Sequence, residues 1–249
     1  MSSASPSSPF IKVPGVANFR SVTVPGLRPQ FLFRSAEPSQ ISSAGIKVLH
    51  DLGIATIFDL RSMDEVSPDA VLVKATEWKG ITRVSIPIFT KENCPPEIHA
   101  QVFNFSTNEA VRNSYNILLR IAPTSYRQVF KHLATESTPT PLLIHCSAGR
   151  GRTGVLIAVI LSLCGVSDEE IAREYSLTNI GLSEMSPEWD GDFKMMEKSL
   201  ISTQENFKAT LEALKNTYGG AERYVKDCCG LTDEEVMRIR EHLLIDKTD

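Results

Sequence analysis

The sequence predicts an α/β protein in which helices flank a central sheet of four or five mostly parallel strands. Largely apolar runs at residues 54–60 and 142–146 are typical of strands that are buried on both faces of a parallel sheet. Segments with apolar residues at helical spacing, such as residues 124–134, alternate with these runs. The length of 249 residues suits a single domain of this class.

The first third of the chain predicts strands and loops around one helix. Residues 13–40 alternate short apolar pieces with Gly and Pro, as hairpin-like strands and their loops do. Ser42 has the side chain of an N-cap, and Gly53 marks the end of the helix that Ser42 opens. After the buried run at residues 54–60, residues 82–88 predict another strand.

Most of the remaining chain predicts helices, starting at about Pro96. Residues 155–164 are apolar on every side, which predicts a central helix rather than a surface one. Residues 167–170 and 232–235 have the pattern of capping boxes, so each predicts a helix start. The two glycines at 219–220 predict a break between two helices near the end of the chain.

The domain organisation follows from these segments. Residues 1–10 have neither the charge nor the apolar run of a targeting signal. They predict a disordered tail instead. Residues 11–249 predict a single domain, in which residues 180–205 form an irregular lid or insertion.

Composition and charge exclude several classes of protein. The chain is 42% hydrophobic and 22% charged, and no apolar run approaches the roughly 20 residues that span a bilayer. The formal net charge of −4 disfavours a nucleic-acid binder, which usually presents excess positive charge. The five cysteines are an odd number without paired spacing and predict a reducing compartment, the cytoplasm. The sequence does not indicate an oligomeric state.

The segment SAGRGRTG, between the run at residues 142–146 and the apolar helix, allows three interpretations. Its three glycines match the dinucleotide-binding pattern G-x-G-x-x-G. Against this, the expected acidic residue would fall at a helix start, and Arg150 would crowd the turn. The second interpretation is a purely structural turn, but it would bury Arg150 and Arg152 without partners, which is unfavourable.

The third interpretation gives each residue a role. Cys146 ends a strand and Arg152 opens a helix, so the thiol lies within a ring of backbone N–H groups that binds a tetrahedral dianion. At a helix N-terminus beside cations, the pKa of a cysteine can fall to roughly 3.5 to 7.5, which makes Cys146 a thiolate nucleophile. The guanidinium of Arg152 offers a planar fork to two phosphate oxygens.

These residues resemble those of a known family. HCSAGRGRTG resembles the signature H-C-x5-R-[ST] of the cysteine-dependent protein tyrosine phosphatases. The stretches NFRSV, FLFRSAEPS, GIATIFDLRSMDE and NTYGGAERYVKDCCGLTDEEVMRIREHLL are similar to the microbial branch of compact tyrosine and lipid phosphatases. The resemblance covers most of the chain and implies a tyrosine-phosphatase-like fold with a helical C-terminal extension.

The resemblance also implies a mechanism. Cys146 is then the nucleophile, Arg152 clamps the phosphate, and water hydrolyses a phosphocysteine intermediate without a metal or organic cofactor. His145 would orient the cysteine backbone, and the Thr153 hydroxyl would hydrogen-bond the Cys146 sulfur. The residues implied in substrate binding are Ser147, Ala148, Gly149, Arg150, Gly151 and Thr153.

The loop departs from the microbial branch, which usually has Lys and Asp in place of Arg150 and Gly151. It is closer to the loop of the large phosphotyrosine-specific enzymes, so we expect a phosphotyrosine protein or another phosphomonoester as the substrate. Arg150, at the rim of the site, keeps phosphoinositides and inositol phosphates open as alternatives. The missing Asp keeps open a module that binds phosphorylated ligands without turnover.

The same departure leaves the general acid to be found elsewhere. Asp59 is the first candidate, because the carboxyl ends of parallel strands share one edge of the sheet, where Asp59 would face the same crevice as Cys146. Its alternative role is an ion pair with Arg61 or Arg20. The further candidates are Glu92, Asp190 and Asp192.

Three arginines outside the loop have two possible roles. They either line a second anion pocket or form ion pairs with nearby acids. The arginines are Arg20, Arg34 and Arg61, and the acids are Asp59, Asp64 and Glu65.

Overall fold

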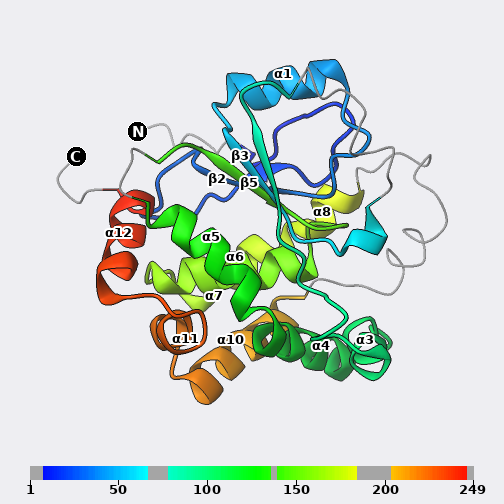
Figure 1. The fold of residues 1–249 in the computed structure, drawn as a ribbon, viewed down its shortest axis with the longest axis vertical. Coiled ribbons are helices and arrows are strands. Elements are labelled where there is room, and N and C mark those ends of the chain that lie inside the picture. The colour runs from blue at the N-terminus through cyan, green and yellow to red at the C-terminus, as the bar shows by residue number, and fades with distance from the viewer. Residues whose placement is uncertain (1–7, 67–77, 136–138, 184–202, 246–249) are drawn as a thin grey trace, which may run out of the picture.

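A five-stranded sheet lies at the centre of the computed structural model, which describes residues 8–66, 78–135, 139–183 and 203–245 (Figure 1). The strand order is β1-β2-β5-β3-β4. Strand β1 is antiparallel to β2, and the other neighbours are parallel, which confirms the predicted mostly parallel sheet. The strands are β1 (Arg20–Ser21), β2 (Leu32–Ser35), β3 (Thr56–Asp59), β4 (Thr82–Ser85) and β5 (Leu142–His145).

The predicted helix starts are confirmed. Ser42, Ser167 and Thr232 each accept a hydrogen bond from the backbone N–H three residues ahead, at 3.2, 3.3 and 3.3 Å. The described helices are α1 (Ser43–Asp51), α3 (Pro96–Val102), α4 (Asn108–Ile121), α5 (Pro123–Leu133), α6 (Gly151–Leu163), α7 (Asp168–Ser176), α8 (Thr178–Ser183), α10 (Gln204–Tyr218), α11 (Ala221–Asp227) and α12 (Asp233–Leu243), with a 3-10 turn at Met63–Glu65.

Helices cover both faces of the sheet, as Figure 1 shows. Side chains alternate along a strand, so Phe33, Ile57 and Leu143 pack with α1 on one face. Their neighbours in sequence pack on the other face with α6, which is buried throughout residues 152–161. This confirms the predicted central helix, and it places the start of α6 directly behind the end of β5.

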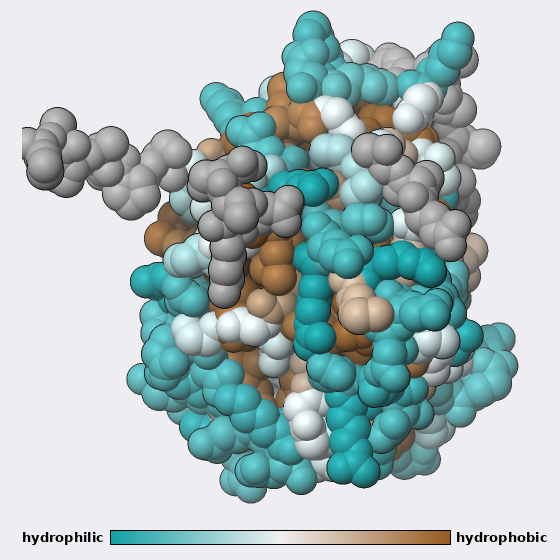
Figure 2. Space-filling model, turned by 90° about the vertical axis from the view of Figure 1, so that its left-hand side faces the viewer, coloured by the Kyte–Doolittle hydropathy of each residue, from teal (hydrophilic) through white to brown (hydrophobic). Residues whose placement is uncertain are grey.

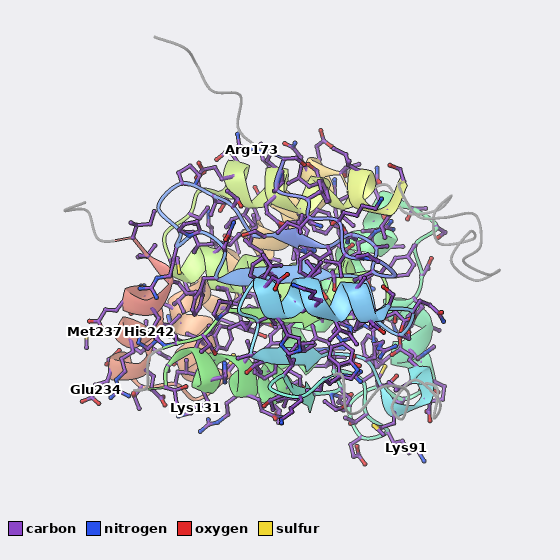
Figure 3. All side chains as sticks on the ribbon, turned by 90° about the horizontal axis from the view of Figure 1, so that it is seen from above. Lys91, Lys131, Arg173, Glu234, Met237 and His242 are labelled. Atoms are coloured by element: carbon purple, nitrogen blue, oxygen red, sulfur yellow. The ribbon has the colours of Figure 1, made fainter. Side chains whose placement is uncertain are left out.

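The C-terminal helices form an extension around α5 and α6. Gly219 and Gly220 have φ angles of 74° and 96°, and they separate α10 from α11 as predicted. Helix α12 is anchored to α5 at two points: the ring Nδ1 of His242 lies 2.8 Å from the Leu133 carbonyl oxygen, and Glu235 forms an ion pair with Lys131. His242 and Lys131 are labelled in Figure 3. On the face that carries α12, hydrophilic side chains predominate and apolar ones show between them (Figure 2).

Two predicted boundaries need correction. Residues 9 and 10 belong to the fold, because Phe10 forms a β-bridge with Arg20 and the Pro9 carbonyl accepts a hydrogen bond from Ser21. The predicted irregular segment begins within α8, and residues 184–202 of it lie outside the described residues. No helix in the described part of the chain is long and apolar enough to cross a membrane.

Candidate active site

The loop between β5 and α6 turns sharply behind β2. Gly149 has a φ of 65°, and a Cβ at this position would lie 2.1 Å from the carbonyl oxygen of Ser35. Only glycine therefore fits there. The turn leaves Cys146 directly after β5, with 2% of its surface exposed.

The backbone of this loop is prepared to bind an anion. Within the described chain, no residue accepts a hydrogen bond from the backbone N–H groups of residues 147–152. These groups surround the N-terminus of α6, where unpaired N–H groups and the helix dipole favour negative charge. These amides are therefore available to an anion, as the predicted ring of donors requires.

Arg152 lies in the first turn of α6, and its guanidinium binds a carboxylate. Its Nη1 and Nη2 donate to the two oxygens of Glu65 at 2.6 and 2.7 Å, and the hydroxyl of Ser147 donates to the same carboxylate at 2.7 Å. The guanidinium also lies over the ring of Phe89, 5.0 Å from its centroid. Sequence reasoning had named Glu65 only as a partner for other arginines, and it missed this pair.

The pair fixes the charge of both groups. Burial opposes ionisation of Glu65, but the hydrogen bonds and charge of Arg152 outweigh it and lower the pKa of Glu65 to about 2. Burial likewise opposes the charge of Arg152, yet the hydrogen bonds to Glu65 raise its pKa. Arg152 is therefore a permanent cation whose fork already binds two oxygens of an anion.

Asp59 lies at the predicted edge of the sheet, but its contacts do not suit the predicted role of general acid. It is in register with His145 at the carboxyl ends of β3 and β5. Its carboxylate accepts from Arg61 Nη2 at 2.7 Å and from Arg61 Nε at 3.0 Å, and it is not among the residues that line the pocket over Cys146. Burial opposes ionisation, but the charges of His145 and Arg61 and the hydrogen bonds from Arg61 lower the pKa of Asp59. The geometry therefore favours the ion pair over the general acid.

Of the other candidate general acids, the structure describes only Glu92. Glu92 is exposed on the loop after β4, next to Thr90 and Lys91 of a second pocket that Asp64 also lines. Asp190 and Asp192 lie outside the described residues.

His145 lies behind the cysteine as expected. It is fully buried, and its Nδ1 lies 3.2 Å from the Cys146 carbonyl oxygen. Its Nε2 has no hydrogen-bond partner among the described residues and lies 3.7 Å from an oxygen of Asp59. Burial lowers the pKa of His145 to about 4, so the ring is neutral at pH 7.

Thr153 differs from its expected role. Its hydroxyl is buried without a hydrogen-bond partner in the described chain, so the expected contact with the Cys146 sulfur is not formed. Thr153 lies in the first turn of α6, where a β-branched side chain has few rotamers.

Arg150 is not at an exposed rim. Only 6% of its surface is exposed, and its Nε and Nη1 lack hydrogen-bond partners among the described residues. It lines the pocket over Cys146, whose walls include the aromatic residues Phe89, Phe103, Phe105 and Tyr115. The expected position at the rim is therefore wrong, because Arg150 is buried among the residues of the pocket wall.

The remaining arginines form ion pairs rather than a second anion pocket. Arg61 pairs with Asp59 as one alternative had it, and also with Glu37. Arg20 and Arg34 share Glu174 of α7, at 2.9 and 2.6 Å. Sequence reasoning did not find Glu174, which is separated from these arginines by more than half of the chain.

A buried cysteine, a loop at the start of a helix and an arginine fork thus lie together, in an arrangement suited to binding an anion. The comparison with family models agrees. A model of the tyrosine phosphatase family matches residues 11–245, and the chain belongs to this family. The protein is thus a hydrolase of that family, which implies a phosphomonoester substrate.

Several known proteins are similar to the chain. The triple specificity protein phosphatase PtpB of Mycobacterium tuberculosis is 26% identical over an alignment 276 residues long. This alignment covers 94% of this chain and 98% of the relative. A tyrosine-protein phosphatase of Nostoc commune is 25% identical, over 84% of this chain and 73% of the relative. The core catalytic domain of the PP-IP phosphatase Siw14 from S. cerevisiae, solved with citrate, matches with a TM-score of 0.43 and 20% identity, over 79% of this chain and 97% of that chain.

Proposed function

We propose that the protein hydrolyses phosphomonoesters in two steps through a phosphocysteine intermediate. The observation that carries this proposal is the Glu65 carboxylate, which shows that the Arg152 fork beside Cys146 binds a two-oxygen anion. A phosphate would take the place of this carboxylate on the fork and receive the free amides of residues 147–152.

The steps follow from this placement. The Cys146 sulfur attacks phosphorus, a P–S bond forms, and the P–O bond to the leaving group breaks. The leaving oxygen takes a proton. Water then attacks phosphorus, the P–S bond breaks, and inorganic phosphate leaves with Cys146 restored. Arg152 balances the negative charge in both transition states.

The proton donor is a separate part of the proposal. Asp59 and Glu65 are held ionised by arginines, so neither is ready to donate a proton at neutral pH. We propose as the donor either Asp64, which lines the second pocket, or Glu92, which is exposed and follows Thr90 and Lys91 of that pocket in sequence. Replacing the donor should slow hydrolysis of an alkyl phosphate far more than that of para-nitrophenyl phosphate, whose leaving group needs little help.

Phosphotyrosine is the substrate that the pocket supports best. Its walls are aromatic, and a phenyl ring attached to a phosphate in the cradle would lie against Phe89, Phe103 and Tyr115. A phosphotyrosine protein is therefore our first proposal for the physiological substrate.

A specific observation favours a second candidate, a substrate with more than one anionic group. Arg150 lines the same pocket with two unpartnered guanidinium nitrogens, and a buried cation without a partner is unfavourable. A second phosphate would supply that partner. The similar PtpB is named a triple specificity protein phosphatase, which agrees with more than one class of substrate. Inositides and inositol phosphates carry the further phosphate that Arg150 would bind.

One set of measurements tests these proposals. Steady-state rates are measured with para-nitrophenyl phosphate, a phosphotyrosine peptide and an inositol polyphosphate, on the parent, Cys146→Ser and Arg150→Met. Arg173→Met is the control, because this exposed arginine of α7 lines neither pocket and points to solvent (Figure 3). Phosphotyrosine specificity predicts little effect of Arg150→Met on the peptide, whereas the second candidate predicts a selective loss with the polyphosphate.

The Cys146→Ser variant decides the class. Loss of all three activities supports the phosphocysteine mechanism. A parent that binds phosphate but turns over none of the substrates would instead indicate a phospho-ligand binding module.

We also propose a reducing compartment, the cytoplasm, as the site of action. In support, all five cysteines are unpaired, and a thiolate nucleophile must stay reduced. Activity that falls on removal of thiol reductant and returns with it would agree, and full activity without reductant would argue against it.

A further inference from the structure

The loop that forms the cradle is held from behind by the N-terminal segment. Three successive carbonyl oxygens of the loop each accept a hydrogen bond from it. The Ser147 carbonyl accepts from the backbone N–H of Glu37 at 3.0 Å. The Ala148 carbonyl accepts from the side-chain amide of Asn18 at 3.0 Å, and the Gly149 carbonyl accepts from Arg34 Nη2 at 2.7 Å.

These contacts determine where the loop amides point. A trans peptide is planar, with its C=O and N–H on opposite sides. A carbonyl that is held outward therefore turns the N–H of the next residue inward. Holding the carbonyls of residues 147–149 aims the N–H groups of residues 148–150 into the cradle, where no described residue accepts them.

The two side-chain donors are themselves fixed. Arg20 donates to the Asn18 side-chain oxygen, so the NH2 group of Asn18 faces the loop. Glu174 binds Arg20 and Arg34 together, and all of these side chains are buried. Asn18 also has a φ of 54°, an uncommon angle for a residue with a side chain. The surrounding contacts thus hold it in a special conformation.

The charge of this cluster also fits an anion site. Two buried guanidinium groups share one carboxylate, and Arg34 Nε has no hydrogen-bond partner in the described chain. An excess buried cation is costly for stability alone. Behind a loop that binds a dianion, the same excess charge lowers the energy of the bound state.

We propose that Asn18 and Arg34, fixed by Arg20 and Glu174, are positioning residues that aim the cradle amides at the phosphate. This inference rests on the proposed function for its ligand. The residues do not contact the reacting atoms. They set the direction of the donors that do.

The test uses tungstate, a tetrahedral oxyanion that needs no turnover to bind. Asn18→Asp keeps the size and the acceptor for Arg20 but replaces the donor to Ala148 with an oxygen. Arg34→Met removes the donor to Gly149. Arg173→Met is the matched control, because this exposed arginine precedes Glu174 on α7 and points to solvent (Figure 3). Unfolding by urea is measured for each protein, so that binding is compared on folded protein.

We expect both test variants to bind tungstate at least about tenfold more weakly, the effect of losing one hydrogen bond to a charged group. Tungstate should also protect Cys146 from alkylation less well in both variants than in the parent, since the amides that hold the oxyanion beside the thiol turn away. The control should match the parent in both readouts.

A purely structural role would lower the stability but leave tungstate affinity and the protection of Cys146 in the folded protein at parent values, and this result overturns the proposal. If Arg34→Met does not fold, Asn18→Asp decides alone. Failure of the proposed function is a different result, in which the parent itself lacks Cys146-dependent hydrolysis.

Discussion

Lowering the pH should destabilise this protein through one buried side chain, His145. Its pKa is about 4 in the folded protein, against 6.5 for an ordinary histidine. Between pH 6.5 and pH 4 this histidine is protonated in the unfolded chain but neutral in the folded chain. Its contribution to the free energy of unfolding is therefore fully present above pH 6.5 and is lost as the pH falls toward 4. The gap corresponds to about 3 kcal/mol in total, of which about 2 kcal/mol should be lost between pH 7 and pH 5.

Urea unfolding of the parent and of His145→Asn at pH 7, 6 and 5 measures this loss. Asparagine retains an N–H donor near the Cys146 carbonyl but takes up no proton in this range. The half-buried His132, whose pKa burial also lowers, contributes to both proteins and cancels in the difference. We expect the stability difference between parent and variant to shrink by about 2 kcal/mol from pH 7 to pH 5. A difference that stays constant with pH would refute the reasoning.

Three further predictions concern the site. Glu65→Gln leaves the Arg152 cation without its charged partner, so tungstate should raise the melting temperature of this variant more than that of the parent, and an equal rise would contradict the prediction. Gly149→Ala places a methyl group against the Ser35 carbonyl, so kcat/KM for para-nitrophenyl phosphate should fall at least about 100-fold; a change below about threefold would show that the loop does not need this turn. Asp59→Asn should lower the stability but leave the ratio of rates on alkyl and aryl phosphates unchanged, since Asp59 is an ion-pair partner rather than the proton donor; a selective loss on the alkyl substrate would restore it as the acid.

The sequence predicted those parts of the molecule that depend on local pattern. The strands at residues 54–60 and 142–146 and the helix at 155–164 are marked by apolar runs, and capping residues mark the helix starts. The loop from Cys146 to Arg152 combines residue types that few other structures need at that spacing. The place of this loop between a strand and a helix start therefore followed from the sequence as well.

Long-range partners could not be predicted in this way. Thirty acidic residues compete for the arginines, and nothing in the local sequence marks Glu65 for Arg152 or Glu174 for Arg20 and Arg34. The burial of Arg150 was not predicted for the same reason, because the aromatic residues of its pocket come from a distant part of the chain. Which charges meet is decided by the packing of α7 and the turn after β3, not by neighbours in sequence.

The hydrogen bond from Arg34 to Gly149 spans 115 residues, and that from Asn18 to Ala148 spans 130. In the sheet, β5 inserts between β2 and β3, which are both synthesised long before it. A nascent chain therefore cannot pair its early strands in the native order until β5 has left the ribosome. The phosphate loop can therefore form only after β5 has been synthesised, and a chain that stops before β5 has neither a complete sheet nor a nucleophile.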